Sequence, residues 1–222
     1  MEEGSNSLFG QLRAACLEDW QAYVEHAFVR QMGDGTLPQD CFKHYLAQDY
    51  LFLIHFSRAY ALAAYKSETL EEIKAAGEGM AAILGEMELH VALCGRWGVT
   101  REALEALPEA KATMAYTRYV LERGLSGDLL DLHVALAPCV IGYGEIGRAL
   151  AAQDRPDHPY HDWIGEYAGD GYQGVAQAAV ETLDRLYASR GGPGRLDGLV
   201  KTFRQATVLE AEFWQMGLDL SS

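Results

Sequence analysis

Apolar residues recur at the helical spacing of three and four residues along almost the whole chain, and no stretch shows the strict alternation of a half-buried strand. Glycine and proline interrupt this spacing at Asp34-Gly35, around Pro156 and Pro159, and at Gly191–Gly194. The spacing predicts helices over residues 7–31, 38–65, 69–96, 108–124, 128–151, 160–167, 171–189 and 195–217, with Asp128 as an N-cap. A chain of 222 residues with this pattern is expected to form one all-α bundle, a single domain over 1–222.

The charge of the chain argues against nucleic acid as a partner. The formal net charge is −14, with 18 basic residues against 32 acidic ones, and the basic residues form no cluster. Binding to a phosphate backbone needs clustered Lys and Arg. We therefore expect neither a nucleic-acid-binding face nor a role in transcription.

Targeting signals and disulfides are not expected either. No apolar run reaches the roughly 18 residues that a membrane span needs, and the polar, acidic start over residues 1–7 does not resemble a signal peptide. The four cysteines are far apart and form no CxxC pair: Cys16, Cys41, Cys94 and Cys139. This spacing is typical of free thiols, so we expect a cytoplasmic protein with no membrane partner.

Three predicted helices each carry a chemically reactive side chain within an apolar stripe. Asp49 lies among Phe42, Tyr45, Phe52 and Phe56, Cys139 lies one turn before Tyr143, and Glu210 lies between Phe203 and Phe213. Burying a carboxylate costs several kcal/mol unless it is paired or hydrogen-bonded. The stripes therefore predict a pocket for a flat, partly polar ligand. The alternative is that the acids lie at solvated stripe edges and that Cys139 is a small core residue.

Metal, haem and dinucleotide sites find little support in the spacing. Helical di-metal proteins use paired Glu-x-x-His motifs, whereas here Glu86 and Glu88 precede His90 by four and two residues, and no second motif follows. His26 could be an axial haem ligand, although a capping or surface role is the simpler interpretation. The glycine-rich segment 142–147 follows no strand, so it predicts close helix contact and not a dinucleotide loop.

Four segments together resemble the TenA/thiaminase II family. They are GTLPQDCFKHYLAQDYLFL over 35–53, PCVIGYGEIG over 138–147, HPYHDWIGEYAGDGY over 158–172 and LEAEFWQMG over 209–217. They occur in the order found in that family, and the resemblance extends over essentially the whole chain.

The resemblance implies a haem-oxygenase-like helical fold that binds no haem, needs no metal or organic cofactor and commonly forms a homotetramer. It implies hydrolysis of 4-amino-5-aminomethyl-2-methylpyrimidine to the hydroxymethylpyrimidine and ammonia, and in many members cleavage of thiamine into pyrimidine and thiazole, as part of thiamine salvage. The alternatives are a binding protein for aminopyrimidines without turnover and an oxygenase-like relative on the same fold.

The resemblance also implies roles for individual residues. It assigns the nucleophile to Cys139, the catalytic acid to Glu210 and the pyrimidine anchor to Asp49. It adds further substrate-binding residues: Tyr116, Tyr143, Tyr167, Phe213 and Phe52. Phe52 departs from the family, because familiar members have a tyrosine there whose hydroxyl could hydrogen-bond the catalytic glutamate.

Overall fold

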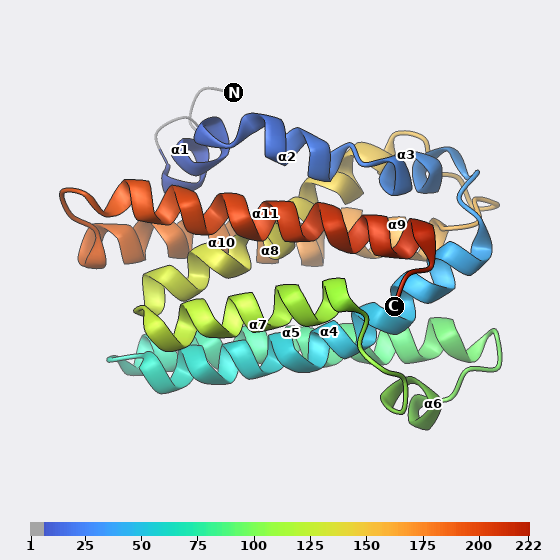
Figure 1. Ribbon diagram of the computed structural model, residues 1–222, viewed down its shortest axis with the longest axis horizontal. Helices are drawn as coiled ribbons and strands as arrows, with labels where there is room; N and C mark the ends of the chain where they lie inside the picture. Colours follow the sequence, from blue (N-terminus) through green and yellow to red (C-terminus); the bar gives the residue numbers. More distant parts are fainter. Residues whose placement is uncertain (1–6) are drawn as a thin grey trace.

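The computed structural model describes residues 7–222, and this part of the chain contains eleven helices and no strand (Figure 1). The helices are α1 Leu8–Ala15, α2 Leu17–Val24, α3 Ala27–Asp34, α4 Gln39–Lys66, α5 Leu70–Gly95, α6 Arg101–Glu105, α7 Lys111–Ser126, α8 Leu129–Ala151, α9 His161–Ala168, α10 Asp170–Arg190 and α11 Arg195–Asp219. The prediction of an all-α fold is confirmed. The acidic first residues, 1–6, lie outside the described part.

The single helix predicted over 7–31 is wrong, because the chain bends twice and forms α1, α2 and α3. Cys16 and Glu25 end the first two helices in non-helical conformations. His26 then begins α3 as its N-cap, and its Nδ1 accepts a hydrogen bond from the Phe28 amide (3.2 Å). The capping role of His26 is thereby confirmed. The bends let the three short helices follow the length of α11 (Figure 1).

The short helix α6 is not predicted by the apolar spacing, which instead begins the next helix at Pro108. Thr100 caps α6 through its side chain, and five residues later the chain leaves the helix, so that α7 begins at Lys111. A single helical turn has too few apolar positions to show a period.

Helix α8 is the central helix of the bundle and packs against α7, α9, α10 and α11. Its predicted N-cap is confirmed. The Asp128 side chain accepts hydrogen bonds from the Leu130 and Asp131 amides, and the Asp131 side chain accepts one from the Asp128 amide. This capping box satisfies amides that a helix start otherwise leaves without partners.

Glycines in α8 allow two neighbours to approach closely. A Cβ on Gly142 would lie 2.3 Å from the Tyr23 ring, and one on Gly147 would lie 2.5 Å from the Tyr167 backbone. The predicted close contact around 142–147 is thus confirmed. It holds α2 and α9 against the turns of α8 that follow Cys139.

Among the described helices, α8 alone has the length and apolar composition to cross a membrane. In the structure, 78% of its most apolar window is buried against other helices, as expected for the centre of a bundle.

Candidate active site

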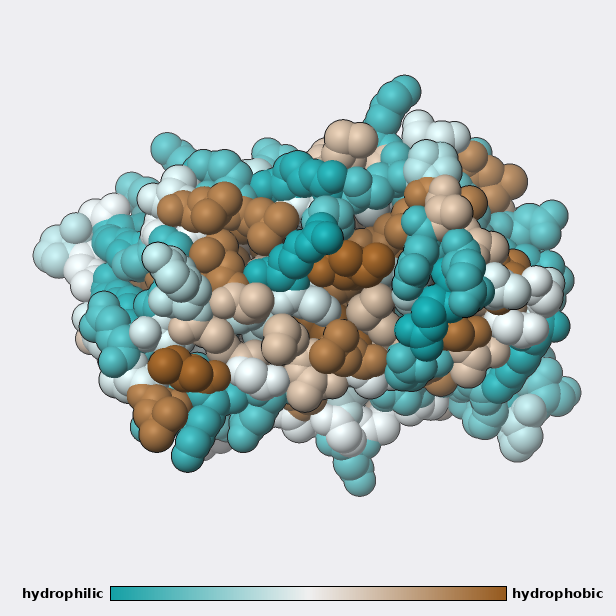
Figure 2. Space-filling view, turned by 90° about the horizontal axis from the view of Figure 1, so that it is seen from below, coloured by the Kyte–Doolittle hydropathy of each residue, from teal (hydrophilic) through white to brown (hydrophobic). Residues whose placement is uncertain are grey.

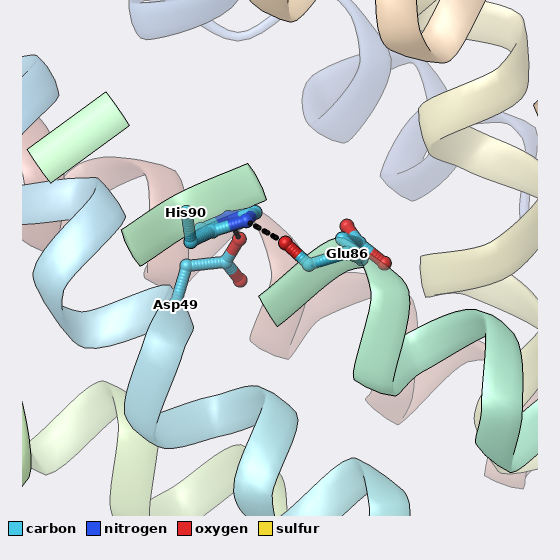
Figure 3. Close-up of side chains that lie close together, drawn as sticks. All are labelled: Asp49, Glu86 and His90. Atoms are coloured by element: carbon cyan, nitrogen blue, oxygen red, sulfur yellow. Dashed lines mark hydrogen bonds and ion pairs between the residues drawn. The ribbon is translucent and has the colours of Figure 1, made fainter. Parts of the chain in front are cut away.

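The carboxylate that interrupts the aromatic stripe of α4 points into the core and has partners there. Asp49 is only 3% exposed. Its Oδ2 accepts a hydrogen bond from the Tyr45 hydroxyl (3.2 Å) and lies 2.7 Å from Nε2 of His90 on α5 (Figure 3). Trp163 donates from Nε1 to the Tyr45 oxygen (3.3 Å). Both hydrogen bonds of Asp49 in the described structure end on Oδ2, so Oδ1 is left for a ligand.

The surroundings of His90 define the charge of this pair. Its Nδ1 lies 2.9 Å from the Glu86 backbone oxygen, so Nδ1 must carry a proton. Nε2 faces the Asp49 carboxylate, so one further proton is shared between the two side chains. Burial opposes a charged imidazole, but the hydrogen bond and charge of Asp49 outweigh it and raise the pKa of His90 to about 9. At neutral pH the His90 imidazole is therefore mainly protonated.

Glu86 extends this cluster toward α9. Its Oε1 accepts a hydrogen bond from the Tyr167 hydroxyl. Burial raises the pKa of Glu86 to about 7, against the opposing charge of His90. In the described structure, one possible ligand atom from each of Asp49, Glu86 and His90 lies within 4.8 Å of the others. The sequence spacing did not indicate this grouping, because Asp49 comes from a different helix.

These three side chains have ligand atoms close enough together for a metal ion, but each already has a hydrogen-bond partner in the described structure. Asp49 and His90 share a hydrogen bond, and Glu86 receives one from Tyr167. A metal would have to replace the Asp49–His90 bond. The absence of a metal cofactor stays a prediction.

A second polar cluster joins α7, α8 and α11. Glu210 on α11 is 1% exposed, and its Oε1 accepts a hydrogen bond from the Tyr116 hydroxyl (2.9 Å). Its carboxyl group also lies near the Cys139 thiol of α8, and each group affects the pKa of the other. Burial raises the pKa of Glu210 to about 8 and that of Cys139 well above its usual value, the latter with the help of the Glu210 charge. At neutral pH both groups are therefore mainly protonated.

Cys139 lies in a turn of α8 that contains a proline. Pro138 precedes it inside the helix and has no amide hydrogen, so this turn lacks one backbone hydrogen bond. The Tyr23 hydroxyl donates to the Pro138 oxygen (3.3 Å). Cys139 is half-buried, unlike the other three cysteines, which are buried.

Aromatic rings connect the two clusters. Phe52 lies with its ring centroid 5.0 Å from Tyr116 and 5.6 Å from Phe213. Tyr143 lies 5.1 Å from Tyr167, and its hydroxyl is 3.5 Å from that of Tyr45. Phe213 and Tyr45 lie with their ring centroids 6.1 Å apart, and Tyr45 donates to Asp49, so the rings connect the Glu210 cluster to the Asp49 cluster. The structure therefore brings together all eight predicted site residues: Asp49, Phe52, Tyr116, Cys139, Tyr143, Tyr167, Glu210 and Phe213.

His90, Glu86 and Trp163 were missed as members of this site. His90 is a polar residue in the buried stripe of α5 that contains Ile83, Met87 and Cys94. It could have been found by the test that singled out Asp49.

Comparison with known proteins agrees with this architecture. Residues 13–220 match the model of the TENA/THI-4/PQQC family. The aminopyrimidine aminohydrolase of Halalkalibacterium halodurans is 37% identical over 201 residues, which cover 89% of this chain and 89% of that protein. Residues 13–220, which match the family model, include both polar clusters.

Solved structures extend the comparison to the fold. A TenA family transcription regulator from Silicibacter sp. TM1040 is 49% identical, with a TM-score of 0.93 over 98% of this chain and 99% of that one. A domain with a heme oxygenase-like fold from Shewanella denitrificans OS217 is 13% identical, with a TM-score of 0.73 over 96% of this chain and 92% of that one, and shows the fold alone. The predicted haem-oxygenase-like fold is confirmed. With nearly the whole sequence matched, this chain belongs to the TENA/THI-4/PQQC family.

Proposed function

We propose that this protein is an aminopyrimidine aminohydrolase of thiamine salvage. It hydrolyses 4-amino-5-aminomethyl-2-methylpyrimidine to the hydroxymethylpyrimidine and ammonia, and it also cleaves thiamine. The observation that carries the proposal is the placement of the Cys139 thiol near the buried, protonated Glu210 carboxyl group, beside the hydrogen-bonded Asp49–His90 pair. The name of the Halalkalibacterium halodurans relative supports the same reaction class.

Asp49 is the proposed anchor of the pyrimidine. An aminopyrimidine edge presents a ring nitrogen next to an amino group, and one carboxylate can pair with both when the nitrogen is protonated. His90 and Tyr45 hold Oδ2 of Asp49, which orients Oδ1 toward the ligand. The rings of Tyr143, Phe213 and their neighbours supply flat apolar walls.

Cys139 is the proposed nucleophile and Glu210 the proton carrier. The thiol gives its proton to the ionised form of Glu210 as the sulfur adds to the ring carbon next to the one that bears the methylene group. This addition breaks aromaticity, and the ring electrons then expel the amine, which leaves as ammonia after Glu210 has protonated it. Water adds to the exposed methylene carbon and loses a proton, the carbon–sulfur bond breaks, and the thiol recovers its proton.

Release of ammonia from the aminomethylpyrimidine, measured beside release of pyrimidine from thiamine, tests the proposal. We expect the first substrate to be turned over, and the reaction to need no added metal or cofactor. A protein that binds either compound in calorimetry but turns over neither would instead be the non-catalytic binding protein. Formation of an oxidised product that requires oxygen would favour the oxygenase-like relative.

The proposal includes assembly and location. α5 exposes Leu70, Ile73 and Leu84, and Figure 2 shows apolar side chains gathered on the face seen from below, where α4 and α5 lie. We expect this face to be covered in a homotetramer, which light scattering would detect. Four free thiols are compatible with a cytoplasmic location. A nucleic-acid partner is not part of the proposal, given the net charge of −14.

A further inference from the structure

Glu86 is an acid of the candidate active site to which the proposed reaction gives no part. Its Oε1 accepts a hydrogen bond from the Tyr167 hydroxyl, and its backbone oxygen lies 2.9 Å from Nδ1 of His90. One carboxylate oxygen of Glu86 and one of Asp49 lie within 4.8 Å of each other, on the two neighbouring helices α5 and α4 (Figure 3). Glu86 therefore belongs to the Asp49 end of the site, where the pyrimidine edge is proposed to bind.

Glu86 and Asp49 share one arrangement, in which protein groups hold one oxygen of the carboxylate and leave the other. Tyr45 and His90 hold Oδ2 of Asp49, and Tyr167 holds Oε1 of Glu86. In the described structure, no hydrogen bond ends on Oδ1 of Asp49 or on Oε2 of Glu86. Asp49 is only 3% exposed, so its second oxygen needs a partner that the described residues do not supply.

The phenol that holds Glu86 has a fixed position. Tyr167 is fully buried, and its ring centroid lies 4.4 Å from that of Trp163 and 5.1 Å from that of Tyr143. Its backbone packs so closely against Gly147 that a Cβ there would clash with it. Because the Tyr167 hydroxyl is held in this way, its hydrogen bond also fixes the direction of the Glu86 carboxyl group.

Glu86 can accept hydrogen bonds from a ligand at neutral pH. Burial raises its pKa to about 7, the charge of His90 opposes this rise, and the charges of Asp49 and Glu166 add to it. Near pH 7 the ionised form is therefore well populated. A ligand N–H that donates to Oε2 favours this form further, because a hydrogen bond to the charged form of a carboxyl group stabilises it.

An aromatic amino group fits two acceptors with this separation. Its two N–H bonds diverge by about 120° in the ring plane, and each N···O distance is about 2.9 Å, so its two acceptors lie about 5 Å apart. The separation of the Asp49 and Glu86 oxygens, at most 4.8 Å, is compatible with this arrangement. With one N–H on Asp49 beside the ring nitrogen, the other points toward the side of the ring that bears the methylene group, and it meets Glu86.

We propose, on the basis of the function proposed above, that Glu86 is a specificity-determining residue, which accepts the second N–H of the substrate's amino group through Oε2. Two carboxylates then hold one amino group, so the site selects a pyrimidine whose amino group carries both hydrogens. A monosubstituted amino group leaves one carboxylate without its donor, and an oxo group, which only accepts, faces two acceptors. The substrate class is thus a primary aminopyrimidine.

Calorimetry with two ligands tests this contact: the hydroxymethylpyrimidine product, and its analogue with a methylamino group in place of the amino group. Wild-type protein is expected to bind the product about 10–150-fold more tightly than the analogue, the usual value of a charged hydrogen bond. Glu86→Ala removes the acceptor and leaves space for the methyl group. It is expected to bind the product about 10–150-fold more weakly than wild type does, and to bind the two ligands within about threefold of each other.

Glu86→Gln is the second variant, and it keeps the size of the side chain and a neutral acceptor. Its product affinity is expected to fall at least about threefold, because a hydrogen bond to a neutral acceptor is weaker than one to a carboxylate. This variant tests the contact even if Glu86→Ala fails to fold, which circular dichroism would detect.

Glu88→Ala is the matched control, with the same substitution two residues further along α5. Glu88 is exposed and pairs with Arg101 at the surface, so this variant is expected to keep the wild-type preference for the product. Tyr167→Phe removes the hydrogen bond to Glu86 but keeps the carboxylate, and it is expected to retain a preference for the product. If Tyr167→Phe lost the preference as completely as Glu86→Ala, the preference would belong to Tyr167 and the proposal would be overturned.

Product affinity at the wild-type value in both Glu86 variants would also overturn the proposal, even if the analogue bound more tightly, because Glu86 would then act through its size alone. Calorimetry needs no turnover, so the proposed function fails or holds separately. A wild-type protein that turned over neither substrate but showed this binding pattern would lose the proposed function and keep the contact.

Discussion

Asp49 and Glu210 are both buried carboxyl groups on aromatic helix stripes, yet the structure treats them differently. Asp49 faces the His90 imidazole at 2.7 Å, so its charge is balanced within the protein. Glu210 accepts a hydrogen bond from the Tyr116 phenol and lies near the Cys139 thiol, and burial raises its pKa to about 8. A carboxylate with a cationic partner is suited to holding a ligand, whereas a carboxyl group that gains and loses a proton near neutral pH is suited to proton transfer.

The largest expected loss of turnover follows from changing Cys139, the residue beside Glu210. Cys139→Ser is expected to fold normally and to lose more than about 10⁴-fold in kcat, because a hydroxyl is a far poorer nucleophile without a strong base. Cys41→Ser is the control: Cys41 donates to the Leu218 oxygen (3.3 Å), a bond that serine can keep. Turnover by Cys139→Ser above about a tenth of wild type would end the covalent mechanism.

Glu210→Gln is expected to lose about 10²–10⁴-fold on the aminomethylpyrimidine, the usual range for general acid–base catalysis. Thiamine is expected to lose less: its cleavage also needs Glu210 to accept the thiol proton, but its thiazole departs as a neutral molecule without a proton from the enzyme. Steady-state rates on both substrates measure the difference. Equal losses would assign Glu210 to the thiol or the water alone, and no loss on either would remove it from catalysis.

Changes at Asp49 and His90 are expected to have smaller effects, on the affinity for the pyrimidine. Asp49→Asn removes a charged hydrogen bond worth about 1.5–3 kcal/mol, which corresponds to about 10–150-fold weaker binding of the hydroxymethylpyrimidine product. His90→Gln is expected to give a smaller loss of the same kind, because it leaves the Asp49 charge in place but unsupported. Calorimetry measures both. If product affinity stayed at the wild-type value in Asp49→Asn, Asp49 would not line the pocket.

The pH dependence of stability is the most modest test. Folding raises the pKa of Glu210 from 4.5 to about 8, so between these values the folded state holds a proton that the unfolded state has lost. The contribution of this group to the free energy of unfolding therefore falls as pH rises, by at most about 1.4 kcal/mol per pH unit. Glu210→Gln removes the effect. Its free energy of unfolding relative to wild type, measured by denaturant titration, is expected to increase from pH 5 to pH 8. If the two proteins showed the same pH dependence of this free energy, Glu210 would be ionised in the folded state.

The aromatic stripes of α4, α8 and α11 could be predicted from the sequence, because helical period reports directly which face is buried. The partner of Asp49 could not, because His90 lies 41 residues away on another helix and meets it only through packing. The breaks at Cys16 and Glu25 were missed for a related reason: the apolar spacing continues across both bends.

The protonated state of the Cys139 thiol determines how the resting protein responds to oxidants and alkylating agents. These reagents attack thiolates, and a thiol whose pKa lies well above its usual value supplies almost none at neutral pH. Peroxide and iodoacetamide are therefore expected to react slowly with the free enzyme. The sulfur becomes reactive only when a bound substrate lets Glu210 take its proton, so the same burial that tunes catalysis also protects the nucleophile between turnovers.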